Sequence, residues 1–408
     1  MAIIFPFKAV RPVPAIAKEV ASPPYDVLSS EEARMLASTN QHSFLHVTKS
    51  EIDMPVDLSI YDNSVYQKAK SNLDQMIAEG MLLKETSECF YIYELLMHGR
   101  SQTGLVCCSS VDDYENDIIK KHEFTRPEKE QDRINHISIT GAQTGNVFLA
   151  YRNHAAIDQI IAEWKRNHQP VYNFTADDGI VHRIWIVDEA SVIQTITHTF
   201  EREIPCTYIA DGHHRAASAA KVRKALGKQA GPGADKFLTT LFPANELKIL
   251  PYNRVVKDLN GMSDEDFLSA LHDDFVVSHY DIPVEPASLH EFGMYLNGSW
   301  YHLTALEGTF DEDPIGVLDV TILSNNVFEK HLDIEDQRTD KRIDFVGGIR
   351  GLKELEKRVN SGEMKVAFSF YPVSIEQLFD IADSGNVMPP KSTWFEPKLR
   401  DGLLTHLI

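Results

Sequence analysis

Three side chains that can bind an anion or carry a proton follow one another at His213, His214 and Arg215. An apolar strand-like run leads into Asp211-Gly212, where glycine permits a tight turn, and the alanine-rich run that follows favours a helix. The three side chains therefore fall in the first turn of a helix, where free backbone N–H groups and the helix dipole favour an anion. A guanidinium fork and a proton-carrying imidazole complete this pattern, which predicts a phosphate-binding site.

Two other interpretations of this segment stay open. In the first, Asp211 caps the helix and the histidines only pack against neighbours, but this leaves unexplained why cationic groups gather where the helix dipole disfavours them. In the second, Asp211, His213 and His214 bind a transition metal together with a distant ligand such as His122. A bound phosphate removes the conflict with the dipole, and adjacent histidines in a turn rarely point at one ion, so we expect no metal ligand set here.

A second polar cluster covers residues 120–133. His122 or Glu123 could act as an acid or base, and Arg126 or Arg133 could bind phosphate oxygens. The segment is not an H-E-x-x-H zinc motif, because arginine occupies the position of the second histidine. The alternative is a solvated charged helix and loop, and the sequence leaves both open.

Two loops place polar groups directly after a Pro-Pro pair, which restricts the backbone. Tyr25 and Asp26 follow the first pair, and Lys391, Ser392 and Thr393 follow the second. Rigidly positioned loops often carry binding residues, so these five residues are candidates for substrate or phosphate contacts. Ordinary structural corners are the alternative.

Strand and helix patterns alternate along the chain without a regular β-α-β succession. Residues 89–96 and 104–109 predict one hairpin, and residues 170–174 and 180–187 predict another around an Asp-Gly turn. A capped helix is expected over residues 263–275. The pattern predicts an α+β fold of mixed β-sheets with interspersed helices.

Two domains are expected from the length and the local patterns. The N-terminal domain would cover residues 1–245, and a C-terminal α+β subdomain would cover residues 246–408, with its terminal loop returning to the site. We expect the stretches 22–27, 121–133, 211–215 and 388–399 to line a single pocket.

The chain has 408 residues, with 40 Lys and Arg against 60 Asp and Glu, which gives a formal net charge of −20. Such an excess of carboxylates argues against nucleic acids and anionic membranes as partners. The apolar start of the sequence is too short to span a membrane and lacks the features of a signal peptide, so a cytoplasmic location is expected. The four cysteines show no disulfide or zinc spacing and are expected to be reduced.

Five ordered blocks resemble the signature blocks of the family known as domain of unknown function 1015. They are SPPYDV at 22–27, KHEFTRPEKEQDR at 121–133, ADGHHRAASA at 210–219, LPYNRVV at 250–256 and MPPKSTWFEPKL at 388–399. The resemblance covers essentially the whole chain.

The block at 210–219 is in turn similar to the phosphate-binding turn of the ParB/sulfiredoxin superfamily, which includes free serine kinases. This resemblance implies a ParB/sulfiredoxin-like core in the N-terminal domain. Gly212 would be the turn glycine, His214 and Arg215 would face the phosphates, and Asp211 would orient them or hold magnesium. Repair of sulfinic cysteine is excluded, because His213 occupies the position of the required cysteine. No basic helix-turn-helix pattern follows residue 245, which argues against DNA binding.

The resemblance and the site residues together predict phosphoryl transfer to or from a small metabolite such as serine or phosphoserine. ATP or ADP with magnesium would serve as cofactor, and Glu123, His213 and Asp211 are the candidate catalytic residues. The direction, kinase or phosphatase, stays open, as does a homo-oligomeric state. The alternatives are a non-catalytic nucleotide-binding regulatory protein and a metal-dependent hydrolase.

Overall fold

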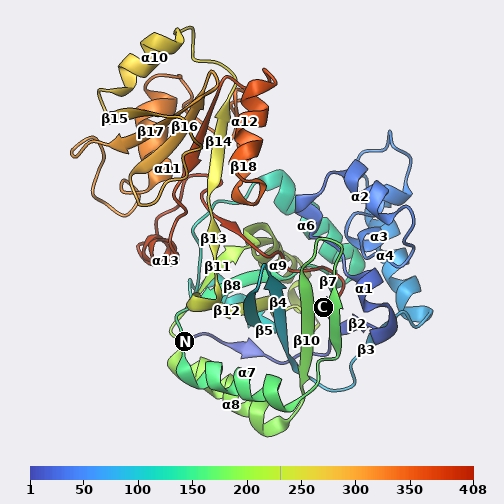
Figure 1. Cartoon of the computed structure of the whole chain (residues 1–408). Coiled ribbons are helices and arrows are strands. Elements are labelled where there is room, and N and C mark those ends of the chain that lie inside the picture. The colour runs from blue at the N-terminus through green and yellow to red at the C-terminus, as the bar shows by residue number, and fades with distance from the viewer. Residues whose placement is uncertain (230) are drawn as a thin grey trace. The chain divides into compact units, whose positions relative to one another are not determined.

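The computed structural model describes residues 1–229 and 231–408, and this part of the chain divides into two units (Figure 1). Unit 1 contains Met1–Leu247 and Pro397–Ile408, and unit 2 contains Lys248–Glu396. The first and last segments of the sequence therefore belong to the same unit. Both units combine β-sheets with helices, which confirms the predicted α+β fold of mixed sheets with interspersed helices.

In the described part of unit 1, nine strands form a mixed sheet in the order β6-β11-β8-β12-β5-β4-β10-β9, with β1 paired to β5. β12 is parallel to β8 and β11 is parallel to β6, whereas the other pairings are antiparallel. The strands are β1 (Ile4–Phe5), β4 (Phe90–Met97), β5 (Arg100–Ser110), β6 (Ile119–Lys120), β8 (Val147–Tyr151), β9 (Tyr172–Thr175), β10 (Val181–Val187), β11 (Thr207–Asp211) and β12 (Lys236–Pro243).

Two short sheets join the ends of the chain to the rest of unit 1. They pair β2 (Val10–Pro12) with β3 (Leu82–Lys84), and β7 (Ala142–Gln143) with β21 (His406–Leu407). The helices of unit 1 are α1 (Ala17–Val20), α2 (Ser30–Ala37), α3 (Leu45–Thr48), α4 (Asn63–Ala78), α5 (Val111–Glu115), α6 (Pro127–Thr140), α7 (Ala155–Asn167), α8 (Ala190–Glu203) and α9 (His213–Leu226).

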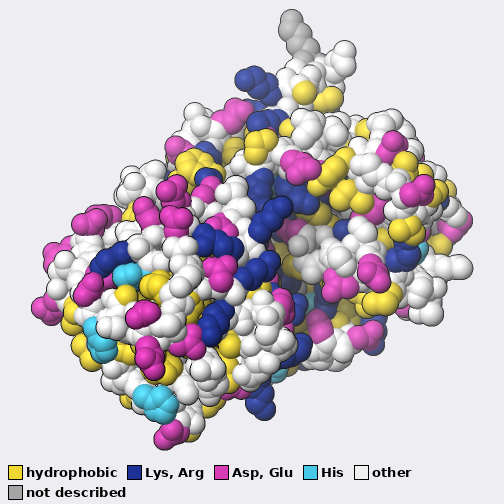
Figure 2. Space-filling view, turned by 90° about the horizontal axis from the view of Figure 1, so that it is seen from above, with side chains coloured by type: hydrophobic (Ala, Val, Ile, Leu, Met, Phe, Trp, Pro, Cys, Tyr) yellow, Lys and Arg dark blue, Asp and Glu magenta, His cyan; other side chains and the backbone are white. Residues whose placement is uncertain are grey.

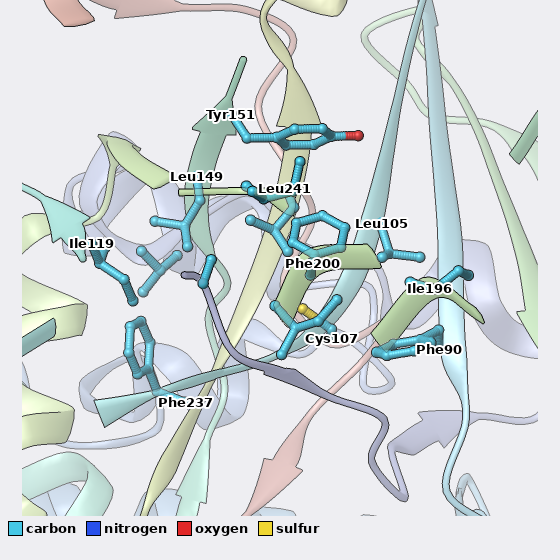
Figure 3. Close-up of a cluster of buried hydrophobic side chains, with 14 of the residues drawn as sticks. Phe90, Leu105, Cys107, Ile119, Leu149, Tyr151, Ile196, Phe200, Phe237 and Leu241 are labelled. Atoms are coloured by element: carbon cyan, nitrogen blue, oxygen red, sulfur yellow. The ribbon is translucent and has the colours of Figure 1, made fainter. Parts of the chain in front are cut away.

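The main hydrophobic core of unit 1 lies between the sheet and three of these helices, α7, α8 and α9 (Figure 3). Leu149 and Leu241 come from the parallel pair β8 and β12, and Phe200 of α8 packs against Tyr151 with ring centroids 5.3 Å apart. Small residues on α9 allow that helix to approach the sheet closely. Apolar burial therefore fixes β11 and α9, the two elements that carry the predicted site.

Unit 2 is built, in its described residues, on a six-stranded antiparallel sheet in the order β15-β17-β16-β19-β14-β18, and a separate pair, β13 with β20. The strands are β13 (Ile249–Leu250), β14 (Tyr252–Val256), β15 (Phe275–Tyr280), β16 (Glu291–Leu296), β17 (Ser299–Ala305), β18 (Ile343–Gly347), β19 (Val366–Phe370) and β20 (Trp394–Phe395). The helices are α10 (Asp264–Leu271), α11 (Asp319–Leu323), α12 (Leu352–Asn360) and α13 (Ile375–Asp383), with a π-helical turn at Ser324–Glu329.

Both predicted hairpins are confirmed, as β4–β5 and β9–β10. The first turns at His98-Gly99, where both residues have positive φ values of 50° and 80°, which suits a two-residue turn between twisted strands. The helix predicted over 263–275 is too long. It ends at Leu271, because Phe275 already begins strand β15, whose pairing with β17 overrides the helical pattern.

Asp and Glu side chains are spread over the face of the molecule shown in Figure 2, with Lys and Arg side chains gathered locally among them. None of the helices built from the described residues is both long and apolar enough to cross a bilayer.

The close packing of the Phe242 ring of β12 on Gly104 of β5 can be tested by mutation. A Cβ atom at Gly104 would lie 2.7 Å from the Phe242 ring, too close for a real contact. We expect Gly104→Ala to lower the free energy of unfolding by about 1–3 kcal/mol, measured by denaturant titration. Adding Phe242→Leu should recover part of this loss, and a fully additive double mutant would contradict the predicted clash.

Candidate functional site

The strand, turn and helix predicted around residues 207–226 are present as β11, Gly212 and α9. Gly212 has φ 98°, and a Cβ atom there would lie 3.1 Å from Arg215 Nε and 3.3 Å from Val147 Cα. The register of β11 against β8 shifts between Ile209 and Asp211, immediately before the turn. Glycine is therefore required here for its backbone conformation and for the space beside Arg215.

The Arg215 side chain is only 10 % exposed and lies at the first turn of α9. Nη1 donates to the carbonyl oxygen of Asn146, whereas Nη2 lies 3.8 Å from Asp26 Oδ2 and 3.7 Å from Asp211 Oδ1. These separations are longer than a hydrogen bond, and Nε has no hydrogen-bond partner among the described residues. Burial opposes the charge, but the carboxylates outweigh it and raise the pKa of Arg215 above its ordinary value. Arg215 is therefore a fixed cation whose Nε and Nη2 donors are free to bind a ligand.

Asp211, which is partly exposed, and Asp401, which is buried, are two carboxylates around Arg215 whose environments differ. Lys398 Nζ lies 2.9 Å from Asp211 Oδ2, and although burial acts against ionisation, Lys398 and Arg215 lower the pKa of Asp211 below its ordinary value. Burial raises the pKa of Asp401 to about 7, with Arg215 opposing the shift. Asp401 Oδ2 has no hydrogen-bond partner within the described structure. Asp211 is thus a permanent anion, and Asp401 can exchange a proton near neutral pH.

Three histidines pack beside the start of α9. The rings of His122 and His213 meet edge to face with centroids 4.6 Å apart, and the backbone N–H of His122 donates to Nε2 of His213 at 3.5 Å. Burial lowers the pKa of His122 to about 4 and that of His213 well below its ordinary value. His214 accepts the backbone N–H of Arg126 at Nε2, at 2.9 Å, and burial lowers its pKa as well. All three imidazoles are therefore neutral at physiological pH.

The predicted cluster at 120–133 and the loop at 22–27 meet through a stacked pair. The guanidinium of Arg133 lies 3.9 Å from the centre of the Tyr25 ring and donates to Asp132 Oδ2 at 2.7 Å. Burial raises the pKa of the Tyr25 hydroxyl above its ordinary value, with Arg133 opposing. Both Arg133 and Tyr25 are thus held in place, whereas the Arg126 side chain is exposed and Glu123 is half-buried.

A small cavity opens beside these groups in unit 1. It provides about 20 Å³ for the centre of a water-sized molecule, which is enough for one oxygen atom. Its lining includes Tyr25, Arg133, Gly145 and Arg215. A Cβ atom on Gly145 would lie 3.3 Å from Asp401 Oδ1 and 3.4 Å from Arg215 Cδ, so the missing side chain keeps this space open.

Within unit 1 the structure brings together three of the four predicted stretches, 22–27, 121–133 and 211–215, and also the end of the fourth, because Lys398 pairs with Asp211. Lys391, Ser392 and Thr393 belong to unit 2, so their part in the same site stays a prediction. Sequence analysis missed Lys398 and Asp401 as site residues. The dense polar run between Pro397 and Gly402 was the available signal.

No group of three or more His, Cys, Asp or Glu residues in the described chain is placed to hold a metal ion. The rings of His213 and His214 each accept a backbone N–H, which directs those nitrogen atoms away from a common centre. The metal-dependent hydrolase therefore finds no ligand set among these residues.

The sequence matches the family described as "Protein of unknown function (DUF1015)" over residues 4–321. Because this match spans most of the chain, the protein belongs to that family. Among curated proteins, no match was found.

Three of the solved structures that are similar to this chain share little sequence identity with it. A free serine kinase in complex with AMP has a TM-score of 0.34 and 14 % identity, over 70 % of this chain and 89 % of that chain. A conserved hypothetical protein from Pyrococcus furiosus has a TM-score of 0.35 and 16 % identity, over 71 % and 93 %. SbnI with C-terminal truncation, from Staphylococcus aureus, has a TM-score of 0.34 and 12 % identity, over 74 % and 87 %.

The pKa of Asp401 predicts how anion binding beside Arg215 depends on pH. Below pH 7 Asp401 becomes neutral and no longer repels an anion, so the affinity for sulfate, whose charge is constant in this range, should rise on acidification. Between about pH 8 and about pH 6 we expect a rise on the order of tenfold, the effect of one charge at ~10 Å with an effective dielectric constant of ~20. Titration calorimetry measures it.

Asp401→Asn is the matched control, because it keeps the size of the side chain and removes its titration. Its sulfate affinity should be high and nearly independent of pH. Burial lowers the pKa of His122 to about 4 and those of His213 and His214 below their ordinary values, so the neighbouring imidazoles contribute little. A pH dependence as steep in Asp401→Asn as in the wild type would contradict the assignment.

Proposed function

We propose that this protein binds the phosphates of a nucleotide at the start of α9 and transfers a phosphoryl group to or from a small metabolite. The observation that carries the proposal is Arg215, a nine-tenths-buried guanidinium with an unused Nε at the first turn of a helix. Phosphate oxygens suit these donors, because a guanidinium fork and free backbone N–H groups at a helix start both favour a multivalent anion.

Lys398 strengthens this proposal from a distant part of the sequence. Its ammonium group pairs with Asp211 directly before the Gly212 turn, so a second cation stands beside the proposed phosphate site. Phosphoryl transfer depends mainly on positioning and on compensation of the charge that the phosphate oxygens carry. Arg215 and Lys398 are the groups that would supply both.

Magnesium fits the residues present, although the described residues form no complete metal cage. In nucleotide enzymes this ion is usually held by one or two carboxylates and by the phosphates themselves. Asp211 and Asp26, both next to Arg215, are the carboxylates that would hold it. The bound ion would supply charge compensation for the phosphates.

The acceptor that we propose is a small hydroxyl-bearing metabolite such as serine, with ATP or ADP as the donor; both follow from the superfamily resemblance of block 210–219. A base must take the proton of that hydroxyl. Asp401 is the strongest candidate by its environment, since its pKa of about 7 matches the working pH of a general base. Glu123 and His213 remain further candidates.

The test uses the purified full-length chain with ATP or ADP, magnesium and a panel of amino acids, with products followed by phosphorus NMR. Phosphoserine supplied with the nucleotide acceptor tests the reverse transfer, and phosphoserine supplied alone tests hydrolysis by water. We expect turnover with at least one of these substrates. Arg215→Ala should weaken nucleotide affinity by roughly tenfold to a hundredfold, because it removes charge-assisted hydrogen bonds.

Arg223→Ala is the matched control. Arg223 is an arginine of the same helix, paired with Asp112 and Glu115 in the last turn of α9, so its loss should leave nucleotide binding unchanged. Nucleotide binding without turnover would favour a non-catalytic regulatory protein. Unchanged binding and turnover in Arg215→Ala would overturn the site assignment.

A further inference from the structure

Arg254, on strand β14 between β19 and β18 of unit 2, is a completely buried cation that no carboxylate in the described chain neutralises. Its side chain lies among aromatic rings, with Phe345 and Phe370 centred 4.8 Å and 5.3 Å from the guanidinium carbon. Burying a charge without a counter-charge is costly, and burial lowers the pKa of Arg254 to about 9. An apolar side chain would fill the same space at less cost, so packing alone does not explain this arginine.

The guanidinium of Arg254 uses its donors on the loop after the second Pro-Pro pair. Nη2 donates to the carbonyl of Pro390 and Nη1 donates to the carbonyl of Lys391, both at 3.0 Å. Nε donates to Gln337 Oε1 at 3.2 Å. On the other side of the loop, the Ser392 hydroxyl donates to the Pro389 carbonyl at 2.6 Å. Arg254 therefore fixes the backbone on both sides of the Pro390–Lys391 peptide bond.

Lys391 is held in an unfavourable backbone conformation by these contacts. Its φ is 58°, in the left-handed region that lysine rarely adopts and that glycine adopts freely. Its side chain is exposed, and its ammonium group lies 5.5 Å from the centre of the Tyr252 ring. Tyr252 in turn packs edge to face on Trp394, with centroids 5.1 Å apart. The strained loop thus places the Lys391 ammonium group near the Tyr252 ring, which is itself held by packing on Trp394.

Within the described chain, Lys391 forms no ion pair, although carboxylates outnumber basic residues by 60 to 40. A strained residue that is kept in place by a buried cation points to a function for the exposed group. The cationic groups of Lys391 and Arg254 lie 5.5 Å and 6.0 Å from the same Tyr252 ring, and neither has a carboxylate partner among the described residues. A small anion would be attracted to both charges.

We propose that unit 2 carries an anion-binding site of its own, in which Lys391 contacts a phosphate oxyanion and Arg254 is the positioning residue that holds Lys391 in place. The ligand class is a small phosphate-bearing molecule, bound through its oxygen atoms. This proposal is argued from residues of unit 2 alone, and it does not depend on the one made for Arg215.

The test titrates inorganic pyrophosphate into the full-length chain by calorimetry, in an Arg215→Ala background that disables the site at α9. We expect saturable binding. Lys391→Gly should weaken this binding about tenfold through loss of the ammonium contact, and should raise the midpoint of thermal unfolding by roughly 2 °C through relief of backbone strain. A purely structural lysine would not show weaker binding together with higher stability.

Four variants complete the design. Lys391→Arg should retain binding. Lys353→Ala should not change it, because Lys353 is another exposed lysine of unit 2 that forms no ion pair with the described residues. Asn297→Gly, at another left-handed position with φ 50°, should leave affinity unchanged. Arg254→Met should weaken binding as much as Lys391→Gly does, and if this variant fails to fold, Lys391→Gly still decides.

No saturable binding in the Arg215→Ala background, or equal affinity in Lys391→Gly and its parent, would overturn the proposal. Neither result affects the nucleotide test at Arg215, which is made with Lys391 intact. Loss of nucleotide binding in Arg215→Ala, conversely, leaves the titration at Lys391 interpretable.

Discussion

The buried guanidinium of Arg215 imposes the main constraint on unit 1. A charge that is nine-tenths removed from water must be compensated, and no single segment of the chain supplies the compensation. Asp211 comes from the preceding strand, Asp26 from the N-terminal loop and Asp401 from the C-terminal segment. The two ends of the chain must therefore meet at α9, and they do so through backbone hydrogen bonds between Ser22 and Asp401.

Unit 2 also buries an arginine, Arg254, but the surroundings of that charge differ from those of Arg215. Arg254 is more deeply buried than Arg215, but its donors go to carbonyl oxygens and an amide, and no carboxylate of the described residues compensates its charge. Carbonyl oxygens satisfy the hydrogen bonds of a guanidinium without cancelling its charge. Arg215 is consequently part of a nearly neutral cluster with unused donors, whereas Arg254 has its donors occupied and leaves a positive field at the loop that holds Lys391.

Local sequence patterns predicted which strands and helices form more accurately than they predicted the residues at which those elements end. The strand, the glycine turn and the alanine-rich helix are all where the sequence indicates, because each follows from local backbone preferences. The helix expected to reach residue 275 stops at Leu271, because Phe275 is needed in a strand that pairs with β17, far along the chain. Lys398 and Asp401 lie in a dense polar run, but that local pattern does not show which distant side chains they meet.

By itself, the sequence determined the family, the fold class and the cationic helix start at His213, His214 and Arg215. These features rest on residue types and short-range order, which a linear chain records directly. Only the tertiary structure decided which carboxylates face Arg215, that all three neighbouring histidines are neutral, and that Lys391 is strained and unpaired. Burial and charge compensation are properties of the folded surroundings, because they depend on side chains brought together from segments hundreds of residues apart.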